Sequence, residues 1–250
     1  MDKLVVEHIE KSFDGLPILT PISFSVRERE FVSILGPSGC GKSTLLHLCA
    51  GLSRPDSGAV RIDGNDAVCM PGTVSYMQQK DLLLPWCTVV QNAGIPLMLK
   101  GMSRPDALGK AASFLPEFGL EGFSGYFPSQ LSGGMRQRAA LLRTYLYRSD
   151  IMLLDEPLGA LDAITREQMQ KWLAAMIEKL GTTVLMVTHD IDEALLLSDR
   201  ILIFSPLPAS IVAELSVQLP HPRIQEQTLL PDFISLKRRV LEHLSMNGAV

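Results

Sequence analysis

The sequence predicts an α/β fold in which a mainly parallel sheet is flanked by helices. First, apolar runs of strand length alternate with stretches of helix length, which is typical of strands joined by crossover helices. Second, the apolar run Phe31–Leu35 passes through several glycines directly into a helical pattern. Third, a helical stretch interrupts the alternation in the middle of the chain. We therefore expect one domain, residues 1–250, with a helical subdomain inserted into its sheet.

Antiparallel strands are expected at the N-terminus. The runs Leu4–Ile9 and Ile22–Val26 are rich in apolar and β-branched residues, and the turn-forming pair Asp14-Gly15 separates them. Two more strands are expected at Gly58–Ile62 and Val74–Tyr76.

The glycine-rich segment after Phe31–Leu35 matches G-x-x-x-x-G-K-[ST], the P-loop pattern that binds the phosphates of a nucleoside triphosphate. Glycines let the backbone approach the phosphates, which then face the loop N–H groups and the helix N-terminus. Lys42 is expected to reach the β- and γ-phosphates and Ser43 to bind Mg²⁺. The fold is therefore predicted to be a P-loop NTPase core, whose phosphate-binding residues are Gly36, Pro37, Ser38, Gly39, Cys40, Gly41, Lys42, Ser43 and Thr44.

The middle of the chain differs from its flanks in composition and in its pattern of apolar residues. A stretch containing Pro and Gly runs from Pro85 to Gly101, followed by a helical pattern over Arg104–Phe118. A loop at Gly122–Ser129 leads to a second expected helix at Gly133–Tyr147. We predict that residues 83–145 form the inserted helical subdomain and that residues 1–82 and 146–205 form the nucleotide-binding core.

Strand and helix alternate again after this insertion. The expected elements are the strand Ile151–Leu154, the helix Ala163–Leu180, the strand Thr183–Thr188, the helix Ile191–Leu197 and the strand Arg200–Ser205. The remaining residues, 206–250, contain several prolines and end in a helical stretch with the basic run Lys237-Arg238-Arg239. We expect them to form a short C-terminal extension.

Two carboxylates follow the apolar run Ile151–Leu154. A buried strand that delivers an aspartate beside a P-loop completes the Mg²⁺ site of such NTPases, and Asp155 has that position. Glu156 is one residue further and points the opposite way, so it can polarise the water that attacks the γ-phosphate.

The segment Leu131-Ser132-Gly133-Gly134 opens the helix Gly133–Tyr147. Free N–H groups at a helix start, with the helix dipole, form a second anion site. A serine N-cap with a glycine-softened first turn is the alternative interpretation. Only one of the two sites carries a lysine, which suggests that they meet across a dimer.

Composition narrows the functional classes. The formal net charge of −4 argues against nucleic acid as the main partner. Cysteines at positions 40, 49, 69 and 87 have no metal-ligand spacing, which indicates free thiols in a reducing compartment. A charge precedes any long apolar run, and no run approaches the roughly 18 residues of a membrane span. We expect a cytoplasmic protein.

The order of these motifs resembles the nucleotide-binding subunit of ATP-binding cassette (ABC) transporters over essentially the whole chain. The resemblance implies that Phe13 stacks on adenine and that Gln79, placed by its distance from Pro85, contacts Mg²⁺ and the membrane partner. Gln78 precedes it, so this position can be off by one. His189 resembles the switch histidine that senses the γ-phosphate.

The resemblance also assigns Leu158-Gly159-Ala160-Leu161-Asp162 to a loop that communicates across the dimer. Phe13, Met135 and Gly159 depart from the commoner Tyr, Gln and Ser of the family, and none of these changes removes a catalytic group. The implied cofactors are ATP and Mg²⁺. The implied catalytic residues are Lys42, Gln79, Glu156 and His189; ATP also contacts Ser132, Gly133, Gly134 and Asp162; Mg²⁺ ligands are Ser43, Gln79 and Asp155.

The branch of the family is indicated by Leu83-Leu84-Pro85-Trp86, by Leu161–Arg166 and by the tail from His221-Pro222-Arg223 to Pro231-Asp232-Phe233, which resemble the nitrate/sulfonate/taurine importer group. This implies a head-to-tail homodimer, peripheral on the cytoplasmic face of the inner membrane. It would act with integral membrane permease subunits and, indirectly, a periplasmic or lipid-anchored solute-binding protein. The alternative is a non-transport ABC ATPase of cofactor assembly; DNA-repair members have long coiled-coil insertions for which this chain has no room.

Overall fold

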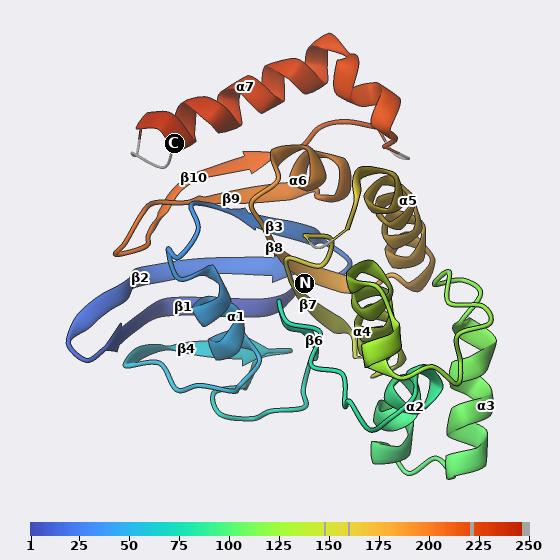
Figure 1. Ribbon diagram of the computed structural model, residues 1–250. Coiled ribbons are helices and arrows are strands. Elements are labelled where there is room, and N and C mark those ends of the chain that lie inside the picture. Colours follow the sequence, from blue (N-terminus) through green and yellow to red (C-terminus); the bar gives the residue numbers. More distant parts are fainter. Residues whose placement is uncertain (148, 160, 221–222, 247–250) are drawn as a thin grey trace.

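Two β-sheets organise the chain in a computed structural model, which describes residues 1–147, 149–159, 161–220 and 223–246, with only the backbone for residues 178–180 and 246 (Figure 1). The larger sheet has the strand order β10-β9-β3-β8-β7-β6, and the smaller one has the order β2-β1-β4-β5. Strands β3, β6, β7, β8 and β9 run parallel, and β10 is antiparallel to β9. The predicted mainly parallel sheet is confirmed.

The strands of the larger sheet are β3 (Phe31–Leu35), β6 (Ser75–Met77), β7 (Ile151–Asp155), β8 (Thr183–Thr188), β9 (Arg200–Phe204) and β10 (Ile211–Ser216). Those of the smaller sheet are β1 (Asp2–Phe13), β2 (Leu16–Arg27), β4 (Ser57–Ile62) and β5 (Asn65–Asp66). The helices are α1 (Lys42–Cys49), α2 (Val89–Leu99), α3 (Arg104–Phe114), α4 (Gly133–Tyr147), α5 (Ala163–Leu180), α6 (Ile191–Leu197) and α7 (Pro231–Met246), with short 3₁₀ turns at Pro128–Gln130 and Gln225–Leu229.

Strand β7 shows why the larger sheet is covered on both faces. Ile151 and Leu153 pack into a core shared with the antiparallel sheet and α1, whereas Met152 and Leu154 pack against the helices α4 and α5. This alternation follows from the two-residue period of a strand. Because Asp155 continues the series of Ile151 and Leu153, its side chain is directed toward α1 and the P-loop.

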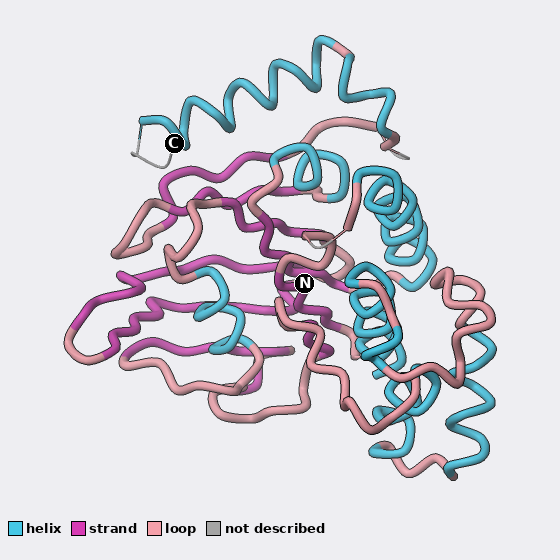
Figure 2. The backbone as a smooth tube through the Cα atoms, viewed as in Figure 1, coloured by secondary structure: helices cyan, strands magenta, loops and turns pink. Residues whose placement is uncertain are grey.

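Helices α2, α3 and α4 gather at one end of the molecule, beside the larger sheet, as Figure 2 shows. Helix α2 contacts both α3 and α4. No helix was predicted between Pro85 and Gly101, but α2 forms there despite Pro96. Thr88 starts this helix with a capping box in which its hydroxyl accepts from the Gln91 N–H, and Gly94 leaves room for α3 to approach.

Other elements also differ from the predictions. β1 and β2 extend well beyond Leu4–Ile9 and Ile22–Val26 because they form one long hairpin, in which Asp14 and Gly15 both adopt positive φ. The helix expected to reach Phe118 ends at Phe114. Strand β10 was not predicted; it extends the sheet along β9, and Leu215 packs beneath α7. Ala160, His221, Pro222 and residues 247–250 of the predicted loop and tail lie outside the described residues.

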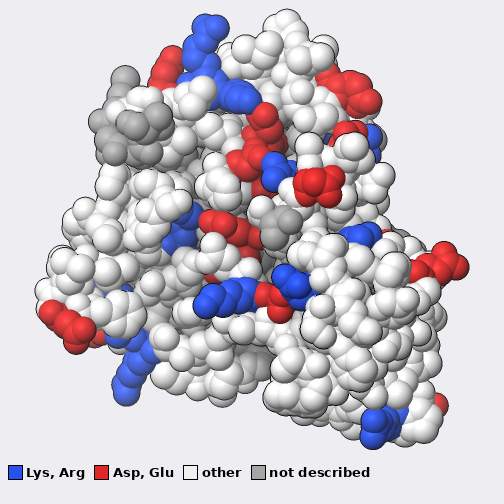
Figure 3. All heavy atoms as spheres, viewed as in Figure 1, with Lys and Arg blue, Asp and Glu red and all other residues white. Residues whose placement is uncertain are grey.

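Both signs of charge are interspersed across the middle of the face in Figure 3, with uncharged areas around them. None of the described helices is long and apolar enough to cross a bilayer.

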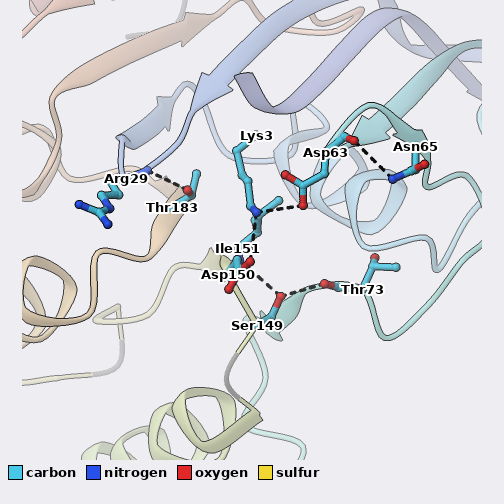
Figure 4. Close-up of polar contacts among 9 residues, drawn as sticks. All are labelled: Lys3, Arg29, Asp63, Asn65, Thr73, Ser149, Asp150, Ile151 and Thr183. Carbon is cyan, nitrogen blue, oxygen red and sulfur yellow. Dashed lines mark hydrogen bonds and ion pairs between the residues drawn. The ribbon is translucent and has the colours of Figure 1, made fainter. Parts of the chain in front are cut away.

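The amino-terminal ends of the parallel strands are joined to the smaller sheet by paired charges (Figure 4). The Lys3 ammonium on β1 lies 2.9 Å from the Asp63 carboxylate and 3.0 Å from that of Asp150, which precedes β7. Nearby, the Ser149 hydroxyl donates to the Thr73 carbonyl. The Lys3 ion pairs tie the two sheets together at the end of the strands opposite the P-loop, and the Ser149–Thr73 hydrogen bond joins the segments that precede β7 and β6.

Candidate functional site

The P-loop connects β3 to α1 as the sequence predicts. Gly41 is the residue before α1 and has a φ of 103°, a backbone conformation that residues other than glycine rarely adopt. A Cβ at Gly41 would also lie 2.8 Å from the Ile18 side chain. Two separate requirements, backbone conformation and space, therefore select glycine here.

Lys42 is the first residue of α1 and is only 5% exposed. Its ammonium donates to the carbonyls of Gly36 at 2.8 Å and Pro37 at 2.7 Å, so it lies inside its own loop. The Cys40 thiol beside it is buried, and burial raises the pKa of that thiol. Cys40 therefore packs as a small apolar residue, and its thiol is not activated as a nucleophile.

Asp155 ends β7 beneath the loop. Burial raises the pKa of its carboxyl, while a hydrogen bond with the Ser43 hydroxyl opposes that rise. Its Oδ1 atom is buried and has no hydrogen-bond partner among the described residues. A carboxylate with a free oxygen beside a hydroxyl is a hard oxygen donor set that suits Mg²⁺.

Glu156 turns away from Asp155 with a φ of 48°, in the left-handed region that is uncommon for residues with a side chain. Its carboxylate accepts a hydrogen bond from the Gln79 amide at 3.2 Å and lies 3.3 Å from the His189 Nδ1 atom. Gln78 makes neither contact, so the geometry favours Gln79 over Gln78. Three predicted catalytic side chains, from three different segments, thus meet at one carboxylate.

These residues border an open cavity of about 390 Å³, within the roughly 300–1,000 Å³ that small-molecule sites occupy. Phe13, half exposed at the end of β1, stands at its rim. The cavity is lined by Phe13, Ile18, Ser38, Gly39, Gly41, Lys42, Ser43, Thr44, Gln79, Glu156 and His189.

The other predicted site residues lie elsewhere. Gly36, Pro37 and Cys40 belong to the loop but do not line the cavity. Ser132, Gly133 and Gly134 lie at the start of α4, where the Ser132 hydroxyl accepts from the Met135 N–H at 3.3 Å. Asp162 caps α5 by accepting from the Thr165 N–H at 3.0 Å.

The motifs overlooked several residues at this site. Ile18 lines the cavity from the long β1–β2 hairpin, and Gln137 of α4 donates to the Glu156 carbonyl at 3.0 Å. Glu193 of α6 is a buried acid whose carboxyl group accepts a hydrogen bond from Thr188, the residue before His189. The two acids Asp192 and Glu193 in the otherwise apolar segment Ile191–Leu197 are the one sequence signal that could have drawn attention to it.

A family model described as "ABC transporter" matches residues 19–159. The chain is 46% identical over 213 residues to the formylaminopyrimidine import ATP-binding protein ThiZ of Halalkalibacterium halodurans, covering 85% of this chain and 83% of that protein. It is 44% identical over 234 residues to the aliphatic sulfonates import ATP-binding protein SsuB 2 of Agrobacterium fabrum, covering 94% and 86%. The dimeric structure of the bacterial ABC transporter cassette MJ0796 matches with a TM-score of 0.80 and 31% identity, covering 87% of this chain and all of that one (100%).

Proposed function

The chain belongs to the ABC transporter family as an ATP-binding, ATP-hydrolysing protein, and from this we propose that it energises a binding-protein-dependent importer. The single observation that carries the proposal is the Glu156 carboxylate, which contacts Gln79 and His189 at the mouth of the P-loop cavity. A carboxylate there can take the proton of a water that attacks the γ-phosphate.

The residues divide the hydrolytic step among them. Lys42 neutralises charge on the β- and γ-phosphates, and the loop N–H groups hold the remaining oxygens. Ser43 and Asp155 would hold Mg²⁺, with Gln79 beside them, and the ion would neutralise negative charge on the phosphates. The water oxygen bonds to the γ-phosphorus as the bond to the ADP oxygen breaks, while the water proton moves to Glu156 and His189 contacts the γ-phosphate.

ATP binding closes a head-to-tail homodimer in this proposal. Ser132, Gly133 and Gly134 do not line the cavity of their own chain, although they open α4 with the free N–H groups of an anion site. A second copy would place these residues against the γ-phosphate held by Lys42. Hydrolysis removes that contact, so the dimer opens again.

In this proposal the chain lies at the cytoplasmic face of the inner membrane and binds a separate integral membrane permease, to which a periplasmic or lipid-anchored solute-binding protein delivers the cargo. Trp86, which follows the Gln79 segment, is 71% exposed, as a contact residue for another protein would be. The relatives named for formylaminopyrimidine and aliphatic sulfonate import support a cargo that is a small solute of the nitrate/sulfonate/taurine type.

Co-purification from native membranes tests the importer assignment. Tagged Glu156→Gln protein would be isolated in mild detergent with ATP present, and its companions identified by mass spectrometry. The matched control is the double variant Trp86→Ser, Glu156→Gln, which differs from the Glu156→Gln protein only at the exposed Trp86 side chain. Recovery of a multi-span permease, reduced with the control, supports an importer. Recovery of soluble partners alone overturns it in favour of a cofactor-assembly ATPase.

A further inference from the structure

His189 lies on a short connection between β8 and α6. Thr188 ends the strand, and Asp190 is the N-cap residue of the helix. The His189 side chain is more than half exposed (57%), so packing alone does not hold it against Glu156. The direction in which His189 extends therefore depends on the backbone set by its two neighbours in the chain.

A hydrogen-bonded clamp joins those neighbours. The Thr188 hydroxyl donates to the Glu193 Oε2 atom and accepts from the Asp190 N–H at 3.1 Å. The Asp190 carboxylate in turn accepts from the N–H groups of Asp192 at 2.9 Å and Glu193 at 3.1 Å. The backbone on both sides of His189 is therefore tied to the first turn of α6.

Glu193 is the costly member of this clamp. It is 3% exposed, and its Oε1 atom is buried without a hydrogen-bond partner among the described residues. Burying a carboxyl group with so few partners is unfavourable. The start of α6 does not require it, because Asp190 already caps the helix.

We propose that Glu193 is a positioning residue for His189, acting through the Thr188 hydroxyl to fix the backbone that presents the imidazole to Glu156. The inference rests on the proposed function, because it assumes that His189 takes part in ATP hydrolysis. Asp190 is held from its other side by Arg166 of α5, whose Nη1 atom lies 3.7 Å from the Asp190 Oδ2 atom. The clamp thus connects His189 to the helix that follows the Asp162 loop.

Steady-state ATP hydrolysis by single and double variants tests this role. Glu193→Ala and Thr188→Val each remove one end of the same hydrogen bond, and each is expected to lower kcat roughly tenfold, while KM for ATP stays within about twofold, because the lost orientation matters in the transition state. Thr188→Val also removes the acceptor of the Asp190 N–H. The double variant is expected to lower kcat no further than Thr188→Val alone, since both changes break the Thr188–Glu193 hydrogen bond. Thr188→Ser keeps the hydroxyl and is expected to restore at least half of the wild-type kcat.

Asp192→Asn is the matched control. Asp192 lies on the same helix turn, but its carboxylate pairs with Lys237 of α7 rather than with the clamp. This control is expected to retain wild-type kcat. If Glu193→Ala and Thr188→Val retain kcat within twofold, or if Asp192→Asn loses as much as they do, the positioning role is overturned. The proposed function fails separately, if Glu156→Gln hydrolyses ATP at the wild-type rate.

Discussion

The two ends of the parallel strands use polar residues in opposite ways. At the amino-terminal end, Lys3 is paired with both Asp63 and Asp150. At the carboxyl-terminal end, Asp155 has a buried oxygen without a hydrogen-bond partner in the described structure, and Glu156 adopts a left-handed backbone conformation. The Lys3 charge at the amino-terminal end is thus paired within the chain.

The carboxyl-terminal end leaves a buried carboxylate oxygen unpaired among the described residues, and a bound cation can pair with it. Buried polar groups without partners are unfavourable in a folded chain. The comparison therefore indicates that binding capacity lies at the end where internal pairing is incomplete. Substitutions at each end test this difference.

The largest effect is expected for Glu156→Gln. Without a carboxylate to take the water proton, hydrolysis should fall by about 10²- to 10⁴-fold, while ATP affinity changes little. Phosphate release and equilibrium nucleotide binding measure the two quantities. The control is Glu167→Gln on α5, whose carboxylate pairs with Lys171 at the surface. Turnover by Glu156→Gln within threefold of wild type would remove Glu156 from the role of base.

Glu193→Gln should stabilise the protein in alkaline solution. Burial raises the pKa of Glu193 from 4.5 to about 7, with Asp190 and Glu156 adding to the rise and Arg166 and the Thr188 hydrogen bond opposing it. The folded state therefore prefers the protonated acid. Its contribution is complete below pH 4.5 and is lost as the pH rises through about 7.

The neutral amide of Glu193→Gln does not have to ionise in the buried site. Its free energy of unfolding should therefore exceed that of the wild type by about 3 kcal/mol at pH 8, and the difference should shrink toward pH 4.5. Denaturant unfolding of both proteins at pH 5 and pH 8 measures it. A difference that does not grow with pH would show that Glu193 is not a buried, proton-binding carboxyl group.

Lys42→Ala should weaken ATP binding by roughly 10- to 100-fold, because charge-assisted hydrogen bonds to phosphate are lost. Calorimetric titration with ATP and Mg²⁺ reports the change, and Lys110→Ala on α3 is the control for loss of one positive charge. Unchanged affinity for Lys42→Ala would contradict the assignment of the phosphate-binding loop.

The smallest effect is expected for Lys3→Met at the amino-terminal end of the parallel strands. Its two carboxylate partners are substantially exposed, so the pairs should contribute about 1 kcal/mol or less to the free energy of unfolding. Hydrolysis should be unchanged. A loss of ATPase activity in a stably folded Lys3→Met protein would mean that the two ends of the strands are coupled, which contradicts the separation of their roles.

Local patterns predicted the parts of the site that a single segment builds. The loop from Gly36 to Ser43 follows from one buried strand, its glycines and one helix start. The contacts of Glu156 with Gln79 and His189 join segments far apart in the sequence, and they depend on a backbone conformation that no residue type announces. Motif resemblance identified these residues, but only the fold shows that they meet.

The same distinction explains the missed elements. Helix α2 contains Gly94 and Pro96, which suggest irregular structure, yet its capping box and its packing against α3 and α4 stabilise it. Strand β10 forms because β9 offers a free edge, which is a property of the sheet rather than of residues 211–216. Tertiary contacts outweigh local propensity in both cases.

The separation of Ser132–Gly134 from the cavity of their own chain has a kinetic consequence. If a second copy completes each site, the turnover rate per chain is not constant in dilute solution but rises with protein concentration until dimers predominate. A permease that holds two copies side by side would give each copy a fixed effective concentration of the other, so turnover would no longer depend on the protein concentration. Free subunits in the cell would then consume little ATP, and assembly itself would restrict hydrolysis to the membrane.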